Sequence, residues 1–80
     1  MTPGGAVELR FFLFRDTTLL LWAEEVAELE GIPVEVVPAP VESDDLCSLA
    51  LQTFPKSVSF LESLLKEEGI PFERHPTPSP

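Results

Sequence analysis

The sequence predicts an α+β fold in which the order strand, helix, strand occurs twice. Three observations predict it. Short apolar runs of strand length alternate with two amphipathic stretches of helix length. Each helical stretch ends at a Gly-Ile-Pro tripeptide, and the two halves match each other at a constant offset along the chain. Eighty residues suit one domain with a single core, so both halves must share one sheet.

The first strand and helix are predicted from residues 7–30. Residues 7–14 form an apolar run that suits a strand and is too short for a helix. Alternation places Arg10, Phe12 and Phe14 on one face and Val7, Leu9, Phe11 and Leu13 on the other. Asp16 or a following threonine caps a helix near residues 17–30. Its inward stripe is expected to consist of Leu19, Trp22, Ala23, Val26 and Leu29.

The remaining elements follow after Gly31, which is the expected stop of the first helix. Residues 34–38 form a second strand, and prolines at both margins favour an edge position. A polar connection precedes a third strand at residues 49–53. Pro55 opens a second helix at residues 56–68, which Gly69 ends before a fourth strand at 72–75. The inward residues of this helix are Val58, Leu61, Leu64 and Leu65.

An internal repeat relates the two halves. Residues 30–35, Glu-Gly-Ile-Pro-Val-Glu, match residues 68–73, Glu-Gly-Ile-Pro-Phe-Glu, 38 positions later. The same offset aligns the preceding helical residues, Trp22 with Phe60 and Ala23 with Leu61 among them. Two such halves make the ferredoxin-like β-α-β-β-α-β sandwich. Right-handed crossovers place both helices on one face of a four-stranded antiparallel sheet of strand order 4-1-3-2.

The second face of this sheet has no predicted helix to cover it. Alternation assigns Phe12, Phe14 and Val37 to that face, among polar neighbours. An uncovered face with aromatic residues favours association with another chain. We therefore expect a homodimer that uses these three residues. Residues 1–6 are expected to be a flexible leader, residues 7–75 the single domain, and residues 76–80 a disordered Pro-rich tail.

Charge and cysteine content limit the classes of function. Fourteen carboxylates against five basic residues give a net charge of −9, which disfavours binding to nucleic acid or to anionic membranes. A single cysteine excludes an internal disulfide and any zinc site with several cysteines. The first residues lack the pattern of a signal peptide, and no apolar run is long enough to span a bilayer. A cytoplasmic protein is the expectation.

Three segments carry a resemblance to a known family: Phe14-Arg15-Asp16-Thr17, Glu30-Gly31-Ile32-Pro33 and residues 37–51. Through them, residues 14–72 resemble the selenium/sulfur (Se/S) carrier protein-like family of small bacterial proteins without an established activity. The family pattern in the third segment is Pro-x-Pro-Arg-Glu, an aliphatic residue, Ser-Ser-x-Cys-Gly and a short apolar strand. Seven residues of this chain fall on it: Pro38, Pro40, Glu42, Cys47, Leu49, Ala50 and Leu51.

The departures from this pattern surround the cysteine. The arginine is Val41 here, the aliphatic residue is Ser43, the serine pair is Asp44-Asp45, and the following glycine is Ser48. Arginine and serine would stabilise an anionic sulfur, whereas two aspartates oppose it, because a nearby like charge disfavours a thiolate. The resemblance therefore implies the family fold with an altered site, in which Cys47 is the candidate acceptor thiol and Pro38, Pro40, Glu42, Asp44, Asp45 and Ser48 are its neighbours.

Two interpretations of Cys47 stay open. As an acceptor of sulfur or selenium, its thiol requires exposure. As a small apolar side chain of the core, it requires burial, and alternation through Leu49 and Leu51 places it on the helix side. The corresponding functions are a non-enzymatic carrier module and an interaction domain with a structural cysteine. True catalysis has the least support, because no base lies within motif distance of Cys47.

The other polar residues predict no cofactor and no metal. His75 has no cysteine or histidine nearby in the sequence, which is typical of a solvated surface residue. The acidic residues Glu42, Asp44 and Asp45 lack the glycine turn and terminal glutamate of a calcium loop. No Gly-rich phosphate loop follows a strand, since Gly4-Gly5 precedes the first one.

Overall fold

The computed structural model describes residues 8–76 as an α+β sandwich. The first half contains β1 (Arg10–Leu13), α1 (Thr17–Leu29) and β2 (Glu35–Pro38). The second half contains β3 (Leu49–Thr53), a short 3-10 turn (Pro55–Ser57), α2 (Val58–Glu68) and β4 (Glu73–His75). The predicted leader at residues 1–6 and the last four residues of the predicted tail lie outside the described residues.

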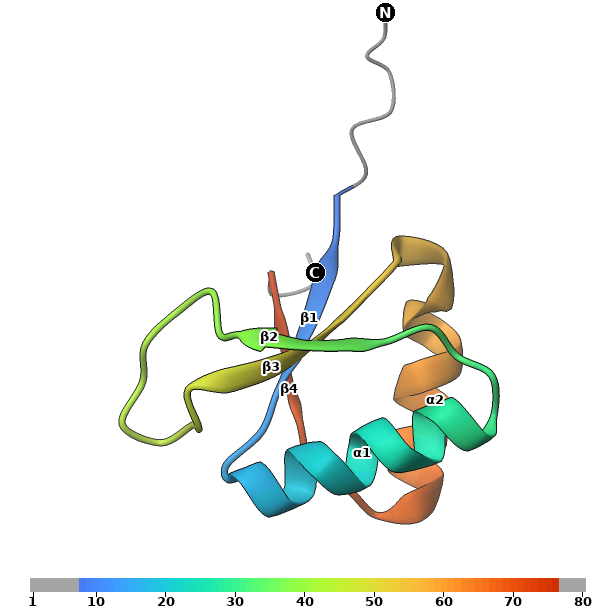
Figure 1. Cartoon of the computed structure of the whole chain (residues 1–80), viewed down its shortest axis with the longest axis horizontal. Coiled ribbons are helices and arrows are strands. Elements are labelled where there is room, and N and C mark those ends of the chain that lie inside the picture. Colours follow the sequence, from blue (N-terminus) through green and yellow to red (C-terminus); the bar gives the residue numbers. More distant parts are fainter. Residues whose placement is uncertain (1–7, 77–80) are drawn as a thin grey trace, which may run out of the picture.

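The four strands form one antiparallel sheet in the order β2-β3-β1-β4, as the repeat predicts. Strand β1 pairs with β3 and with β4, and β2 pairs with β3. Both helices lie on the same side of this sheet (Figure 1). The architecture is therefore ferredoxin-like, and the predicted fold class is confirmed.

The two helices end in the same way, 38 residues apart. The Ile32 amide donates to the Ala27 carbonyl at 2.9 Å, and the Ile70 amide donates to the Leu65 carbonyl at 2.9 Å. Gly31 and Gly69 adopt left-handed conformations, with φ of 73° and 76°. A residue with positive φ after the last turn, followed by this long-range amide bond, is the Schellman motif. The internal repeat thus reappears as an identical pattern of hydrogen bonds.

The core lies between the helices and the sheet. From α1 it takes Leu20, Ala23 and Ala27, and from α2 it takes Val58, Leu61 and Leu65. These two sets are also related by the 38-residue offset. Phe12, Phe14, Leu51 and Ile70 complete the buried cluster, and Phe72 packs against Phe12 with ring centroids 5.1 Å apart.

The predicted faces of β1 are wrong. Phe12 and Phe14 are 0% exposed and belong to the core beneath the helices, instead of lying on the uncovered face. The physical reason is that β1 is a central strand with apolar residues on both sides, so alternation alone cannot tell which set faces the helices. The predicted dimer therefore cannot use Phe12 or Phe14 in this fold.

The predicted stripe of α1 is partly wrong as well. Trp22 and Leu29 are 41% and 77% exposed, although both were expected to face inward. Leu20 and Ala27 are buried in their place, while Ala23 is buried as expected. Residues 19–23 are all apolar, so several helical stripes can be drawn through them, and packing against the sheet selects the one that contains Leu20.

The outer face of the sheet consists of two rows that cross all four strands. The registers place Val37, Ala50, Leu13 and Glu73 in one row and Glu35, Gln52, Phe11 and His75 in the other. Leu13 and Ala50 are nevertheless 4% and 0% exposed. Phe11 and His75 lie side by side with ring centroids 6.3 Å apart.

Candidate functional site

The loop between β2 and β3 carries the predicted site residues. The Ala39 amide donates to the Ser48 carbonyl at 2.8 Å, which continues the β2–β3 pairing by one step and closes the base of the loop. At its far end the Asp45 amide donates to the Ser43 hydroxyl at 3.2 Å. Short polar side chains of this kind stabilise turns by bonding to the backbone two residues on. Figure 1 shows this loop projecting beyond the paired strands.

Two hydrogen bonds hold Cys47. Its amide donates to the Phe14 carbonyl at 2.8 Å, which ties the end of the loop to the segment between β1 and α1. Its thiol donates to the Leu49 carbonyl at 3.2 Å. The side chain is half-buried and packs against the core on the helix side, as strand alternation predicts. Cys47 is therefore ordered, and part of it faces solvent.

Beside Cys47 the loop encloses an open hollow of about 330 Å³. Its lining residues are Pro38, Ala39, Val41, Glu42, Ser43, Leu46, Cys47 and Ser48. Four of the predicted site residues, Pro38, Glu42, Cys47 and Ser48, thus come together. Pro40, Asp44 and Asp45, which were also predicted, do not line the hollow.

The charged groups of the loop differ in whether they line this hollow. Asp44 and Asp45 are exposed in the turn and are not among its lining residues, whereas Glu42 contributes to the lining. Ser43 and Ser48 add two hydroxyl groups to it. Among the described residues, Glu42 is thus the carboxylate that lines the hollow, and the hydroxyls are potential hydrogen-bond donors.

Arg15 is a neighbour of the loop that was not among the predicted site residues. Arg15 and Leu46 line a second, smaller cavity of about 90 Å³, together with residues of β1 and the segment leading to β4. Leu46 directly precedes Cys47, and Phe14, which accepts the Cys47 amide, directly precedes Arg15. Only the fold brings these positions together, because more than thirty residues separate them along the chain.

A family model described as "Putative Se/S carrier protein-like" matches residues 10–76. The chain belongs to this family. Searches of curated proteins and of solved structures find no match. The Se/S carrier-like match covers both segments that meet at Cys47, namely residues 14–17 and the loop from Pro38 to Ser48. The sequence signal for Arg15 was therefore the family segment Phe14-Arg15-Asp16-Thr17, which contains it.

His75 does not join the Se/S carrier-like site. Its ring lies beside that of Phe11 on the outer face, tilted by 49°, whereas Cys47 packs on the helix side of the sheet. Among residues 8–76, no group of three or more histidine, cysteine or acidic side chains is placed to hold a metal ion. The helices in this range are also too short or too polar to cross a membrane. The chemistry available at the hollow is that of one thiol with hydroxyl and carboxylate neighbours.

Proposed function

We propose that this member of the Se/S carrier-like family carries sulfur or selenium on Cys47, which acts as an acceptor thiol without catalysing a reaction of its own. One observation supports the proposal most: Cys47 lines an open hollow formed by the loop that carries the family motif. A structural cysteine needs no such opening. A thiol that accepts an atom from another molecule needs both solvent access and room for the incoming group.

The proposed step is the transfer of a terminal sulfur atom from a persulfide donor, R–S–SH. The Cys47 thiol loses its proton to solvent, and its sulfur attacks the outer sulfur of the donor. A bond forms between the Cys47 sulfur and the transferred sulfur as the S–S bond of the donor breaks. The thiolate R–S⁻ leaves and takes up a proton, and Cys47 then carries the –S–SH group. No net oxidation occurs. Selenium follows the same course when the donor carries R–S–SeH.

The neighbours of Cys47 are given separate roles in this step. The Ser43 and Ser48 hydroxyls donate hydrogen bonds to the transferred atom. The thiol gives up its hydrogen bond to the Leu49 carbonyl before it reacts. Glu42 opposes a second negative charge in the hollow and so slows loading from anionic donors. A single unpaired cysteine stays a thiol in a reducing compartment, so we propose the cytoplasm as the location of the protein.

Mass spectrometry tests the carrier role. The protein is purified from its native cell without reductant, digested, and searched for a Cys47 peptide heavier by one sulfur or one selenium atom. We expect this adduct in a fraction of the protein, with its loss after treatment with dithiothreitol. The control is Cys47→Ser expressed in the same cell, which must show no adduct. A Cys47 that is wholly unmodified under these conditions contradicts the proposal.

A second candidate function is that of a non-catalytic interaction domain in which Cys47 is structural. Cys47 packs against the core cluster, and its thiol is engaged with the Leu49 carbonyl, which favours this alternative. It predicts that Cys47→Ala lowers stability measurably while association with a partner is unchanged. It also predicts that thiol reagents label Cys47 only as fast as the protein unfolds.

A further inference from the structure

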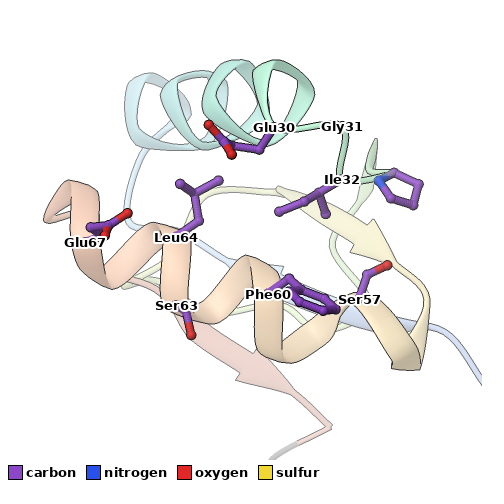
Figure 2. A pocket seen from close by; sticks show the side chains of 9 residues that line it. Glu30, Gly31, Ile32, Ser57, Phe60, Ser63, Leu64 and Glu67 are labelled. Carbon is purple, nitrogen blue, oxygen red and sulfur yellow. The ribbon is translucent and has the colours of Figure 1, made fainter.

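A groove runs between α2 and the segment that follows α1. Its volume is about 430 Å³, and its walls come from residues 30–33 on one side and, on the other, from Ser57 and from α2 as far as Glu67 in its last turn. Figure 2 shows Leu64 pointing from α2 toward α1, and Ile32 extending into the space between the two helices. Phe60 lies one turn before Leu64, near the start of α2 and beside Ser57 (Figure 2). Residues 30–33, which line the groove, follow the C-terminal end of α1, whereas the loop between β2 and β3 lies on the side of its N-terminal end (Figure 1).

Part of the lining of the groove is apolar and open to solvent. Phe60 is 69% exposed, and Ile32 and Leu64 are half-buried. An aromatic side chain this exposed gains little from the fold, since the apolar area it removes from water is small. Exposed aromatic residues beside a concave surface are typical of sites that bury area only when a partner docks.

The charged residues of this groove are all negative. Glu30 and Glu67 line it, and both side chains extend toward its Leu64 end (Figure 2). Lys66 on the same helix contributes to a different cavity, on the side that faces Ile70 and Phe72. Two such grooves brought together would set four carboxylates against one another in a chain of net charge −9, which disfavours a second copy as the occupant.

We propose that this groove docks a basic amphipathic segment of a partner protein. An apolar side chain of the segment covers Phe60, Ile32 and Leu64, and flanking lysine or arginine residues meet Glu30 and Glu67. Because the groove is remote from the loop, such a partner leaves Cys47 uncovered. The inference stands on this surface alone and does not depend on the role of the thiol.

Direct binding of a peptide tests the proposal. The probe is a fluorescein-labelled peptide with leucine at helical spacing and lysine elsewhere, followed by fluorescence anisotropy at low ionic strength. The groove is small, so we expect a dissociation constant on the order of 10 μM, which weakens as salt is added. A peptide of the same composition without an apolar face, and one with glutamate in place of lysine, are expected to bind far more weakly.

The internal repeat supplies a matched control for the apolar contact. Phe60 and Trp22 occupy equivalent positions on exposed faces of α2 and α1, but only Phe60 lines the groove. Phe60→Ser is expected to weaken binding about tenfold, as truncation of a central anchor does. Trp22→Ser is expected to change it by less than about twofold. Equal losses in both variants overturn the proposal.

The charged contact has a control of equal charge. The double variant Glu30→Gln/Glu67→Gln is compared with Glu25→Gln/Glu68→Gln, which removes the same charge from exposed positions outside the groove lining. Only the first pair is expected to weaken binding and to reduce its salt dependence. Equal effects would mean that the peptide responds to net charge alone, and this outcome rejects a specific site.

Nuclear magnetic resonance of the unmodified protein keeps the test independent of any variant's stability. Amide shifts on addition of the peptide are expected at Ile32, Phe60 and Leu64. Shifts confined to other surfaces overturn the proposal. Shifts at these three residues that grow with protein concentration in the absence of peptide identify a second copy as the occupant, and overturn it equally.

Discussion

Thr53 carries a buried hydroxyl at the end of β3. The residue is 2% exposed, and its hydroxyl donates to the Pro33 carbonyl at 2.7 Å. Pro33 lies just before β2, which is the edge strand that pairs with β3. A single side chain thus fixes the point at which the chain enters the edge strand, where a proline cannot contribute an amide to the ladder.

Thr53→Val removes this hydrogen bond while keeping the shape of the side chain. The Pro33 carbonyl is left without its partner, so we expect the free energy of unfolding to fall by about 1–2 kcal/mol. Urea denaturation followed by circular dichroism measures the change. The control is Thr18→Val on the exposed surface of α1, where the same substitution should alter stability by less than about 0.5 kcal/mol.

The reactivity of Cys47 is predicted to be low and adjustable. The Cys47 thiol is half-buried and donates a hydrogen bond to the Leu49 carbonyl, so iodoacetamide should alkylate the folded protein at pH 7 no faster than it alkylates a small-molecule thiol. Replacing Asp44 and Asp45 by serine restores the pattern of the family, and should quicken the reaction. Because Glu42 lines the hollow and the two aspartates do not, Glu42→Gln should quicken it at least as much.

The contrary outcomes of this measurement are informative in different ways. Fast alkylation of the unmodified protein would mean that a group such as Arg15 offsets the local negative charge, which strengthens the carrier proposal. Absence of alkylation in every variant, with labelling only after unfolding, assigns Cys47 to the core. Rates are compared at low ionic strength, since salt screens exposed charges.

Phe11 to Phe14 illustrate which side chains the sequence could not assign. These four residues are consecutive and all apolar, so both faces of β1 carry large apolar side chains. Either face could therefore pack against the helices. Gln52 and Glu35 lie on the outer face, as the alternation of apolar and polar residues in β3 and β2 indicates. Pairing of β1 with β3 could have decided the orientation of β1, but registers are not visible in a single sequence.

Helix ends are the elements that were predicted most closely. Asp16 accepts a hydrogen bond from the Leu19 amide at 2.9 Å, which is the N-cap contact expected from its position. Gly31 and Gly69 follow the last helical turns in left-handed conformations. These signals are local, so they survive without knowledge of the tertiary structure. The buried stripe of α1 is not local, but the 38-residue offset, which pairs Leu20 with Val58, contained the answer.

The two glycines provide a test at the scale of the helix. A Cβ atom at Gly31 or at Gly69 would meet no atom within 4 Å, so alanine there is opposed by its backbone conformation and by nothing else. We expect Gly31→Ala and Gly69→Ala each to lower the free energy of unfolding by about 1 kcal/mol, and by similar amounts. Asparagine tolerates this conformation better and should cost less. Thermal unfolding of all four variants provides the comparison.

At the scale of the molecule, the strand order was predictable and the site was only partly so. The repeat and the handedness of crossovers leave few topologies for two β-α-β halves. Which side chains line the hollow depends instead on how the loop between β2 and β3 folds. The family motif located Cys47 in that loop, but whether Glu42 or Asp44 faces the hollow depends on a turn that begins at Ser43. The contact of this loop with Phe14 and Arg15 depends on the whole fold.

The homodimer stays a prediction, and Phe11 takes the place of Phe12 and Phe14 among the residues expected at its interface. The outer face retains Phe11 and Val37, both half-buried, so dimerisation through it is tested by Phe11→Glu and Val37→Glu. Either variant should dissociate a dimer in sedimentation at micromolar concentration while leaving the circular dichroism unchanged. Phe12→Glu is the contrasting variant: it places a charge in the core and should unfold the domain. A monomeric unmodified protein contradicts the prediction.

The strand order also has a consequence for how the domain forms. Each of the three strand pairs joins a strand from before the Cys47 loop to one from after it, and neither half contains a pair of its own. Neither half can therefore be a folding intermediate with its own sheet, and the domain should fold in one cooperative step. The same interleaving lets two chains exchange halves. In such a dimer the loop would be the hinge, and the chemistry of Cys47 would be tied to the geometry of the exchange.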